Sequence, residues 1–230
     1  MKLKFAAVLF DLDNTLLDRD RTFRRFCETF VASFFSGLPA DRKRTIIEQI
    51  VIADRDGYRN KEDMFAELRD ALPWSRKPEI AELMEYYRKH YVHSSTLMDS
   101  AVELLDRCRG RGLKLGMITN GSNAIQYGKI DKLGLRRHFD YIVVSEEAGV
   151  RKPDRRIFEM ALSELNVRAE EAVFVGDHPV NDIQGAADVG MQTVWMIRSQ
   201  PWDGRLSARP LKRIRHLQEL FELLFSDGCG

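Results

Sequence analysis

Two aspartates stand one residue apart at the end of a strand-like apolar run near the start of the chain. In VLFDLDNTLL, residues 8–17, Asp11 and Asp13 are followed by Thr15. Carboxylates this close repel, so a bound cation, or a task that needs two protonation states, would account for the pair. An extended strand cannot point both side chains the same way, so we expect a turn at Asn14 and Thr15. Asp11 is then a candidate nucleophile and metal ligand and Asp13 a candidate general acid and base, although a strand-end Asx turn would also explain the pair.

Polar residues also end a second apolar run and precede a later helix. GLKLGMI is followed by Thr119, Asn120 and Gly121, whose hydroxyl and backbone N–H groups could bind an anion at a helix N-terminus. The same composition is common in ordinary loops. Lys152, in RKPD, stands before the helix expected to begin at Pro153; a single lysine is more often only solvated.

A third polar end follows the apolar run near residue 175. In VFVGDHPVND, Asp177 comes directly after Gly176, and Asp182 lies five residues further on. Asp182 is either part of a site or only a partner of the helix dipole. His178 could touch a substrate, but we interpret it as a loop histidine.

The elements that must position these residues follow from the hydrophobic pattern. Apolar runs rich in β-branched residues predict strands buried on both faces at 7–10, 113–118, 141–144, 172–175 and 193–196. From residue 99 onward, helical patterns lie between them. This alternation predicts an α/β fold with a Rossmann-like, doubly wound parallel sheet.

Residues 18–92 interrupt the alternation with helical patterns alone. One apolar stripe covers about residues 23–35, and further amphipathic stretches lie near 41–53, 61–71 and 78–91. We therefore predict a core of residues 1–17 and 93–230 with a helical-bundle cap of about four helices at 18–92, acting as a lid over the strand ends. At the other end of the chain, 211–226 is predicted to be one helix packed on the core, with partner binding as the alternative.

Composition excludes several classes of protein. The 230 residues are 44% hydrophobic and 31% charged with a net charge of +1, which is typical of a globular protein and not of one that binds a nucleic-acid polymer. The cysteines Cys27, Cys108 and Cys229 lack zinc-site spacing and are interpreted as reduced thiols, which favours the cytoplasm. No segment is long enough to predict a membrane span, and nothing indicates an oligomeric state.

Taken in order along essentially the whole chain, these motifs resemble those of the haloacid dehalogenase superfamily. The closest resemblance is to its phosphatase branches with a helical cap inserted after the first strand. The matching motifs are DxDxT at Asp11, Asp13 and Thr15; the strand end Thr119, Asn120 and Gly121; Lys152 with Pro153; and GDxxxxD at Gly176, Asp177 and Asp182.

The resemblance implies a Mg²⁺-dependent phosphatase. Mg²⁺ would be held by the carboxylate of Asp11, the backbone carbonyl of Asp13 and the carboxylate of Asp177, completed by waters and a phosphate oxygen. Asp11 would attack phosphorus to form an aspartyl-phosphate, while Asp13 protonates the leaving alcohol and then activates water. The acid at position 13 favours phosphoryl transfer, because the dehalogenases of the superfamily have a non-acidic residue there.

The same resemblance assigns the remaining polar residues. The Thr119 hydroxyl, the Asn120 backbone N–H and the Lys152 ammonium would neutralise the phosphoryl oxygens. Asp182 would orient a metal-bound water or Lys152.

The substrate depends on the cap, where DRDGYRNKEDMF, residues 54–65, combines a turn with aromatic and basic side chains. Tyr58 could stack on a ring and Arg59 could bind an anion, or the segment is a solvated connection between helices. The chain looks most like pyrimidine nucleotidase-like and acylneuraminate phosphate phosphatases, which implies small phosphomonoesters such as nucleotides or sugar phosphates. A phosphomutase on the same scaffold and a non-catalytic binding protein that keeps the fold are the alternatives.

Overall fold

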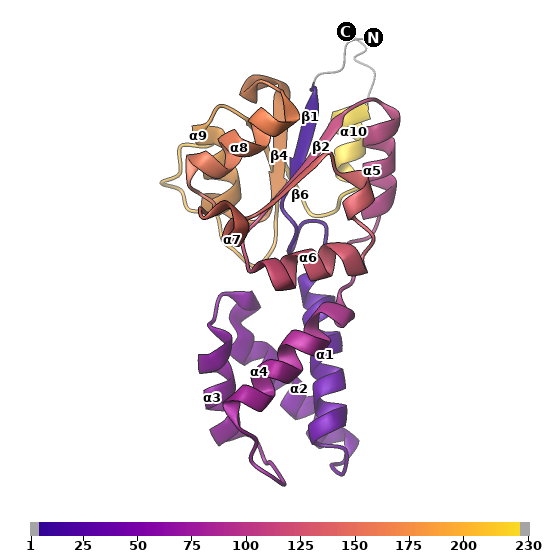
Figure 1. Cartoon of the computed structure of the whole chain (residues 1–230), viewed down its shortest axis with the longest axis vertical. Coiled ribbons are helices and arrows are strands. Elements are labelled where there is room, and N and C mark those ends of the chain that lie inside the picture. Colours follow the sequence, from indigo (N-terminus) through magenta and orange to yellow (C-terminus); the bar gives the residue numbers. More distant parts are fainter. Residues whose placement is uncertain (1–4, 226–230) are drawn as a thin grey trace. The chain divides into compact units, whose positions relative to one another are not determined.

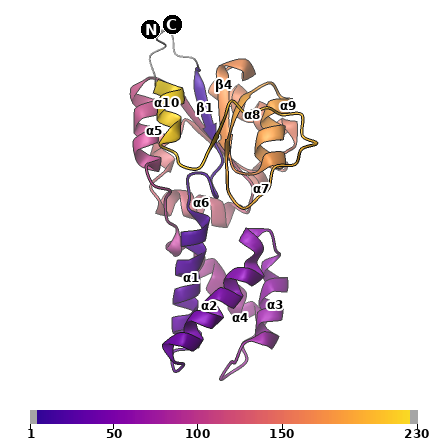
Figure 2. The same cartoon turned by 180° about the vertical axis from the view of Figure 1, so that it is seen from behind.

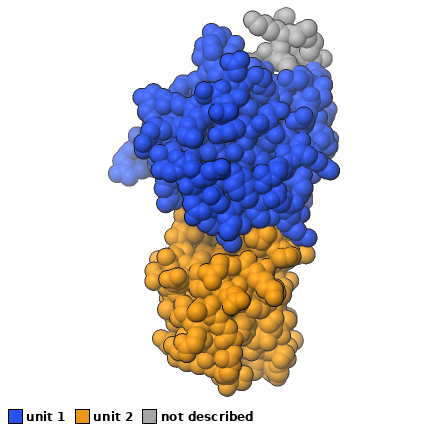
Figure 3. Space-filling view, in the orientation of Figure 1, with its two compact units in different colours: residues 1–18, 97–230 blue, residues 19–96 orange. Residues whose placement is uncertain are grey.

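The computed structural model describes residues 5–225 of the chain, which forms two compact units (Figure 3). Unit 1 combines Met1–Asp18 with Leu97–Gly230, and unit 2 is Arg19–Thr96. The inserted unit follows the first strand and its turn.

Unit 1 is built on a six-stranded parallel sheet (Figure 1). Its strands are β1 (Ala7–Phe10), β2 (Lys114–Thr119), β3 (Tyr141–Val144), β4 (Ala172–Gly176), β5 (Gln192–Met196) and β6 (Lys212–Ile214). They lie in the order β3-β2-β1-β4-β5-β6, and every neighbouring pair is parallel. The predicted α/β class with a doubly wound parallel sheet is confirmed.

Helices and short helical turns connect these strands. The helices of unit 1 are α5 (Ala101–Gly110), α6 (Asn123–Lys132), α7 (Ser145–Ala148), α8 (Arg155–Leu165), α9 (Gly185–Asp188) and α10 (Glu219–Phe225). Its other helical segments are the three-residue turns η3 (Arg136–His138) and η4 (Ala169–Glu171) and the six-residue π-helix η5 (Pro179–Gln184). Because the sheet is parallel, the carboxyl ends of β1, β2 and β4 lie at one edge, where ligands of open α/β sheets bind.

The two faces of the sheet divide the core of unit 1. Along β1, Val8 and Phe10 join the apolar cluster on one face, and Ala7 and Leu9 join the cluster on the other. Side chains of α5 and α10 belong to the first cluster, and those of α8 and α9 belong to the second. The ribbons of these two pairs of helices lie on opposite sides of the sheet (Figures 1 and 2). Burial on both faces explains why the central strands are continuous apolar runs.

The predicted helix at 211–226 is wrong in its first half. Residues Lys212–Ile214 form β6, whose backbone pairs with β5, and α10 begins only at Glu219. Leu211 and Ile214 have helical spacing, yet Leu211 is 42% exposed while Ile214 is buried, as a strand requires. Residue 226 lies outside the described residues.

Unit 2 contains four helices: α1 (Arg19–Phe34), α2 (Ala40–Asp54), α3 (Lys61–Ala71) and α4 (Ile80–Tyr91), with the short turns η1 (Arg55–Gly57) and η2 (Val92–Ser94). The predicted helical insert after the first strand is confirmed. Its core is aromatic: the Phe26 ring lies edge-on to Tyr87 and Tyr91, at centroid distances of 5.4 and 5.9 Å. Unit 2 therefore has a core of its own.

Cys27 and Cys108 are free and buried, and burial raises the pKa of both thiols. Cys229 lies outside the described residues. Within residues 5–225, the helices are too short or too polar to cross a bilayer.

Candidate active site

The chain turns directly after β1, as predicted. The Leu12 carbonyl accepts hydrogen bonds from the backbone N–H groups of Leu16 and Leu17, at 3.0 and 2.9 Å. Asn14 has a φ of 62°, the left-handed conformation that asparagine tolerates in tight turns. The side chains of the neighbouring aspartates consequently reach different partners.

Asp11 belongs to a buried group of charges. Lys152 Nζ lies 2.6 Å from Asp11 Oδ1 and 2.7 Å from Asp182 Oδ1, and all three residues are buried. Burial raises the pKa of the Asp11 carboxyl to about 7, while the Lys152 ammonium opposes that shift. Burial also disfavours the charged form of Lys152, but Asp11 and Asp182 hold its pKa above the usual value. Lys152 is therefore a fixed cation beside the candidate nucleophile.

The position of Lys152 is set by Asn120. The Asn120 side-chain oxygen accepts from the Lys152 backbone N–H at 2.9 Å, and its amide nitrogen donates to the Lys152 carbonyl at 3.0 Å. This side-chain role was not predicted. The predicted phosphate contact of the Asn120 backbone N–H stays a prediction.

The end of β4 brings two carboxylates to the same place. Trp195 Nε1 donates to the Asp177 carbonyl at 2.8 Å, and Asp182 Oδ2 accepts from the His178 backbone N–H at 2.9 Å. A Cβ at Gly176 would lie 2.5 Å from the Cβ and Cγ of Asp182, so only glycine allows this approach. His178 Nδ1 accepts from the backbone N–H groups that begin η5, so it caps that segment.

These carboxylates fit a divalent cation. Asp11, Asp177 and Asp182 are buried and offer carboxylate oxygens within 4.8 Å of one another. Three buried carboxylates, of which two contact Lys152, leave an excess of negative charge that a cation would compensate. Oxygen donors alone suit a hard ion such as Mg²⁺. Asp11 and Asp177 were predicted ligands, and Asp182 contacts Lys152 at 2.7 Å; the ligand roles and the orienting role of Asp182 stay predictions.

Asp13 makes a separate set of contacts. Its two carboxylate oxygens accept from Lys129 Nζ at 2.8 and 3.0 Å, and one accepts from Gln126 Nε2 at 3.0 Å. The same Gln126 nitrogen lies 2.5 Å from the hydroxyl oxygen of the fully buried Thr119. Gln126 and Lys129 were missed from the sequence. The signal that could have found them is their spacing: two polar residues three apart, on one face of the helix that follows the Thr119 strand end.

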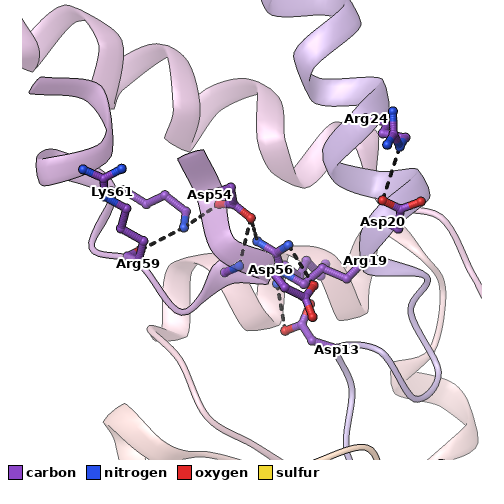
Figure 4. Close-up of polar contacts among 10 residues, drawn as sticks. Asp13, Arg19, Asp20, Arg24, Asp54, Asp56, Arg59 and Lys61 are labelled. Carbon is purple, nitrogen blue, oxygen red and sulfur yellow. Dashed lines mark hydrogen bonds and ion pairs between the residues drawn. The ribbon is translucent and has the colours of Figure 1, made fainter. Parts of the chain in front are cut away.

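The predicted specificity residues Tyr58 and Arg59 lie in unit 2, between the end of η1 and the start of α3. Figure 4 shows Arg59 beside Lys61 and Asp54. Asp54 Oδ2 accepts from Arg19 Nη2 at 2.6 Å and from the Gly57 backbone N–H at 2.8 Å, which fixes this turn. Arg59 Nη2 pairs with Glu67 at 2.5 Å. The Tyr58 side chain is largely exposed. A substrate contact by Tyr58 or Arg59 stays a prediction.

Comparisons with known proteins place this geometry in a family. A family model described as haloacid dehalogenase-like hydrolase matches residues 8–196. The glyceraldehyde 3-phosphate phosphatase of Pyrococcus abyssi is 32% identical over 82% of this chain and 79% of its own length. The pyrimidine 5′-nucleotidase YjjG of Escherichia coli is 31% identical over 96% of this chain and 99% of its own length.

Solved structures of haloacid dehalogenase-type proteins have the same fold as this chain. A haloacid dehalogenase-type hydrolase from Bacillus subtilis, bound to magnesium, is 26% identical with a TM-score of 0.74 over 97% of this chain and 100% of that chain. A dehalogenase at 19% identity has a TM-score of 0.73 over 99% of this chain and 100% of its own, and shares the fold. The family model covers most of the chain, and both curated relatives match over most of their length. The chain therefore belongs to the haloacid dehalogenase-like hydrolases, in the phosphatase branch with a helical insert after the first strand.

Proposed function

We propose that this protein is a Mg²⁺-dependent phosphatase that hydrolyses small phosphomonoesters through an aspartyl-phosphate on Asp11. The observation that carries the proposal is the separation of the two aspartates. Asp11 lies with Lys152 in the buried carboxylate group, whereas Asp13 is held by Lys129. One carboxylate can attack while the other handles the proton.

Each residue then has a separate task. The Asp11 carboxylate attacks phosphorus, the bond between phosphorus and the ester oxygen breaks, and that oxygen takes a proton from Asp13 to leave as the alcohol. Asp13 next removes a proton from the water that attacks the acyl phosphate, which releases inorganic phosphate and restores the Asp11 carboxylate. The Lys152 ammonium neutralises developing charge on the phosphoryl oxygens. Thr119 and the Asn120 backbone N–H are proposed to contact the same oxygens.

The proposed metal ligands are the Asp11 and Asp177 carboxylates and the Asp13 carbonyl, with Asp182 orienting Lys152. When bound, Mg²⁺ would supply positive charge that favours ionised Asp11 and offsets the charge of the phosphate. This role fits the excess of buried carboxylates over ammonium groups at the site.

The proposed substrates are small phosphorylated metabolites, with nucleotides and sugar phosphates first. The two curated relatives described above are named for a sugar phosphate and for pyrimidine nucleotides. Tyr58 and Arg59 are proposed to contribute to this choice. Since Arg59 is paired with Glu67, the exposed Tyr58 ring is the better candidate for a direct contact.

The test is phosphate release from a panel of nucleotides, sugar phosphates and an aryl phosphate, with Mg²⁺ and with a chelator. We expect turnover only with the metal, and none above background in Asp11→Asn, because no other group can accept the phosphoryl. Asp131→Asn, at an exposed aspartate paired with Arg136, is the matched control and should keep wild-type activity. Wild-type-like activity in Asp11→Asn would overturn the mechanism.

The same panel separates the alternatives. A phosphomutase would isomerise a sugar phosphate and release little phosphate, and a non-catalytic binding protein would do neither. Product analysis by ³¹P NMR distinguishes transfer within the substrate from transfer to water.

A further inference from the structure

We propose that Lys129 is a positioning residue that holds the general acid Asp13 toward the leaving group. The inference rests on the proposed function and goes beyond it, because none of the motifs that predicted the site includes Lys129. Lys129 would act through Asp13, without touching the substrate.

Lys129 is not an ordinary surface lysine. Its side chain is 4% exposed, whereas the Asp13 side chain is 25% exposed. A buried ammonium is costly unless paired, so its location in α6 requires acceptors. Its Nζ contacts both oxygens of Asp13, and it lies 2.9 Å from Gln126 Oε1. The ammonium is therefore fixed by two residues at once.

Contact with both oxygens restricts how the Asp13 carboxylate can rotate. Gln126 adds a second restraint, because its Nε2 donates to Asp13 Oδ2 at 3.0 Å. A general acid must be aimed at the atom it protonates, since hydrogen-bond reach is about 3 Å. Two donors from one helix therefore fix the orientation of the Asp13 carboxylate, while its side chain stays 25% exposed.

The spacing of residues in α6 and a glycine in the loop before it bring Gln126 and Lys129 to Asp13. Gln126 and Lys129 are three residues apart and share one face of the helix. A Cβ at Gly121 would lie 2.7 Å from Cγ of Gln126, so the loop approaches this side chain closely. Gln126 also contacts Thr119, which links the position of Asp13 to a residue proposed to bind phosphate.

The experiment compares Lys129→Met with wild type on two substrates that differ in their need for an acid. An alkyl phosphate releases a poor leaving group that needs protonation, and p-nitrophenyl phosphate releases a good one that does not. The parameter is kcat/KM, because it reports the step in which the leaving group departs. Lys132→Met, at an exposed lysine of the same helix, is the matched control.

We expect Lys129→Met to lower kcat/KM for the alkyl phosphate by roughly 10- to 100-fold, less than loss of the acid itself, and for p-nitrophenyl phosphate by less than about threefold. In an Asp13→Asn background, Lys129→Met should add no more than about a twofold loss. Equal losses on both substrates, or additive losses in the double variant, would overturn the proposal. Normal turnover of the alkyl phosphate by Asp13→Asn alone would instead overturn the proposed role of Asp13.

A second measurement separates positioning from phosphate binding. The inhibition constant of inorganic phosphate should stay within about twofold of wild type in Lys129→Met and should rise in Lys152→Met. An equal rise in both variants would make Lys129 a phosphate ligand and would contradict the proposal. If Lys129→Met does not fold, judged by circular dichroism, Lys129→Gln provides the same comparisons with a neutral side chain that can still hydrogen-bond.

Discussion

At the scale of single residues, each of the two neighbouring aspartates is paired with its own buried lysine. Asp11 contacts Lys152 from the loop before α8, and Asp13 contacts Lys129 from α6. Each ammonium attracts the ionised form of its carboxylate and so offsets part of the repulsion between the two aspartates, while burial still raises the pKa of Asp11. The chain can therefore hold the two aspartates one residue apart, each with a different lysine partner.

From the sequence, Asp11 and Lys152 were assigned to one site, with Lys152 facing the phosphoryl oxygens, whereas Lys129 was not singled out. Asp11, Lys152 and Asp182 come from the ends of elements that a parallel sheet must bring to one edge, so their meeting follows from topology. Lys129 lies inside a helix, and the sequence does not say which side of α6 faces the site. The contact of the Asn120 side chain with the backbone of Lys152 was not predictable either, because it depends on a loop conformation.

Asn120 yields a prediction at this scale. Removing its two hydrogen bonds to the Lys152 backbone in Asn120→Ala should cost about 1–3 kcal/mol of unfolding free energy. We also expect kcat/KM to fall by up to roughly 10²-fold, because a displacement of about 1 Å at a reacting group has that effect. Urea unfolding and phosphate release measure the two quantities.

The matched control is Asn123→Ala. The Asn123 side-chain oxygen makes no hydrogen bond to residues 5–225, so its removal should leave activity unchanged. Wild-type kcat/KM in Asn120→Ala would mean that Lys152 is positioned without it.

At the scale of elements, long periodic segments were predicted well and one short strand was not. The four helices of unit 2 and the strands β1 to β5 follow from apolar periodicity, since burial of one or both faces imposes it. In contrast, β6 has only three residues, two of them basic, and its strand form comes from pairing with β5. Such tertiary pairing overrides the first part of the helical pattern, Leu211 and Ile214, while the later part of the same pattern forms α10.

The segment η5 provides a prediction at the scale of elements. In Gly176→Ala, the new Cβ would lie 2.5 Å from Cβ and Cγ of Asp182, so η5 must move away from the end of β4. Asp182 would then lose its 2.7 Å contact with Lys152. We expect at least about a tenfold loss of kcat/KM, since small displacements at a reacting group are costly.

Gly110→Ala is the matched control for that substitution. An added Cβ at Gly110, the last residue of α5, meets nothing within 4 Å, so stability should be unchanged or slightly higher. Equal activity in the two glycine variants would show that β4 tolerates the side chain and that the position of Asp182 is not critical.

At the scale of the whole molecule, two units with separate cores form from one chain. The sequence indicated this division because an alternating α/β pattern is interrupted by helices alone, and the insert brings its own aromatic core. Both units also contain a histidine whose pKa is lowered by burial: His138 in unit 1 and His90 in unit 2. Acid should therefore destabilise both units.

His138 gives the sharper prediction. Burial lowers its pKa in the folded protein, and Asp106 at 3.2 Å opposes that shift without reversing it. Between the folded pKa and the usual value of about 6.5, the unfolded chain binds a proton that the folded protein does not. The free energy of unfolding should therefore fall as the pH drops below about 6.5.

We expect His138→Gln to lose part of this dependence in urea unfolding at about pH 7.5, 6.5 and 5.5. His216→Gln, at an exposed histidine, should keep the wild-type slope, and an unchanged slope in His138→Gln would contradict the prediction.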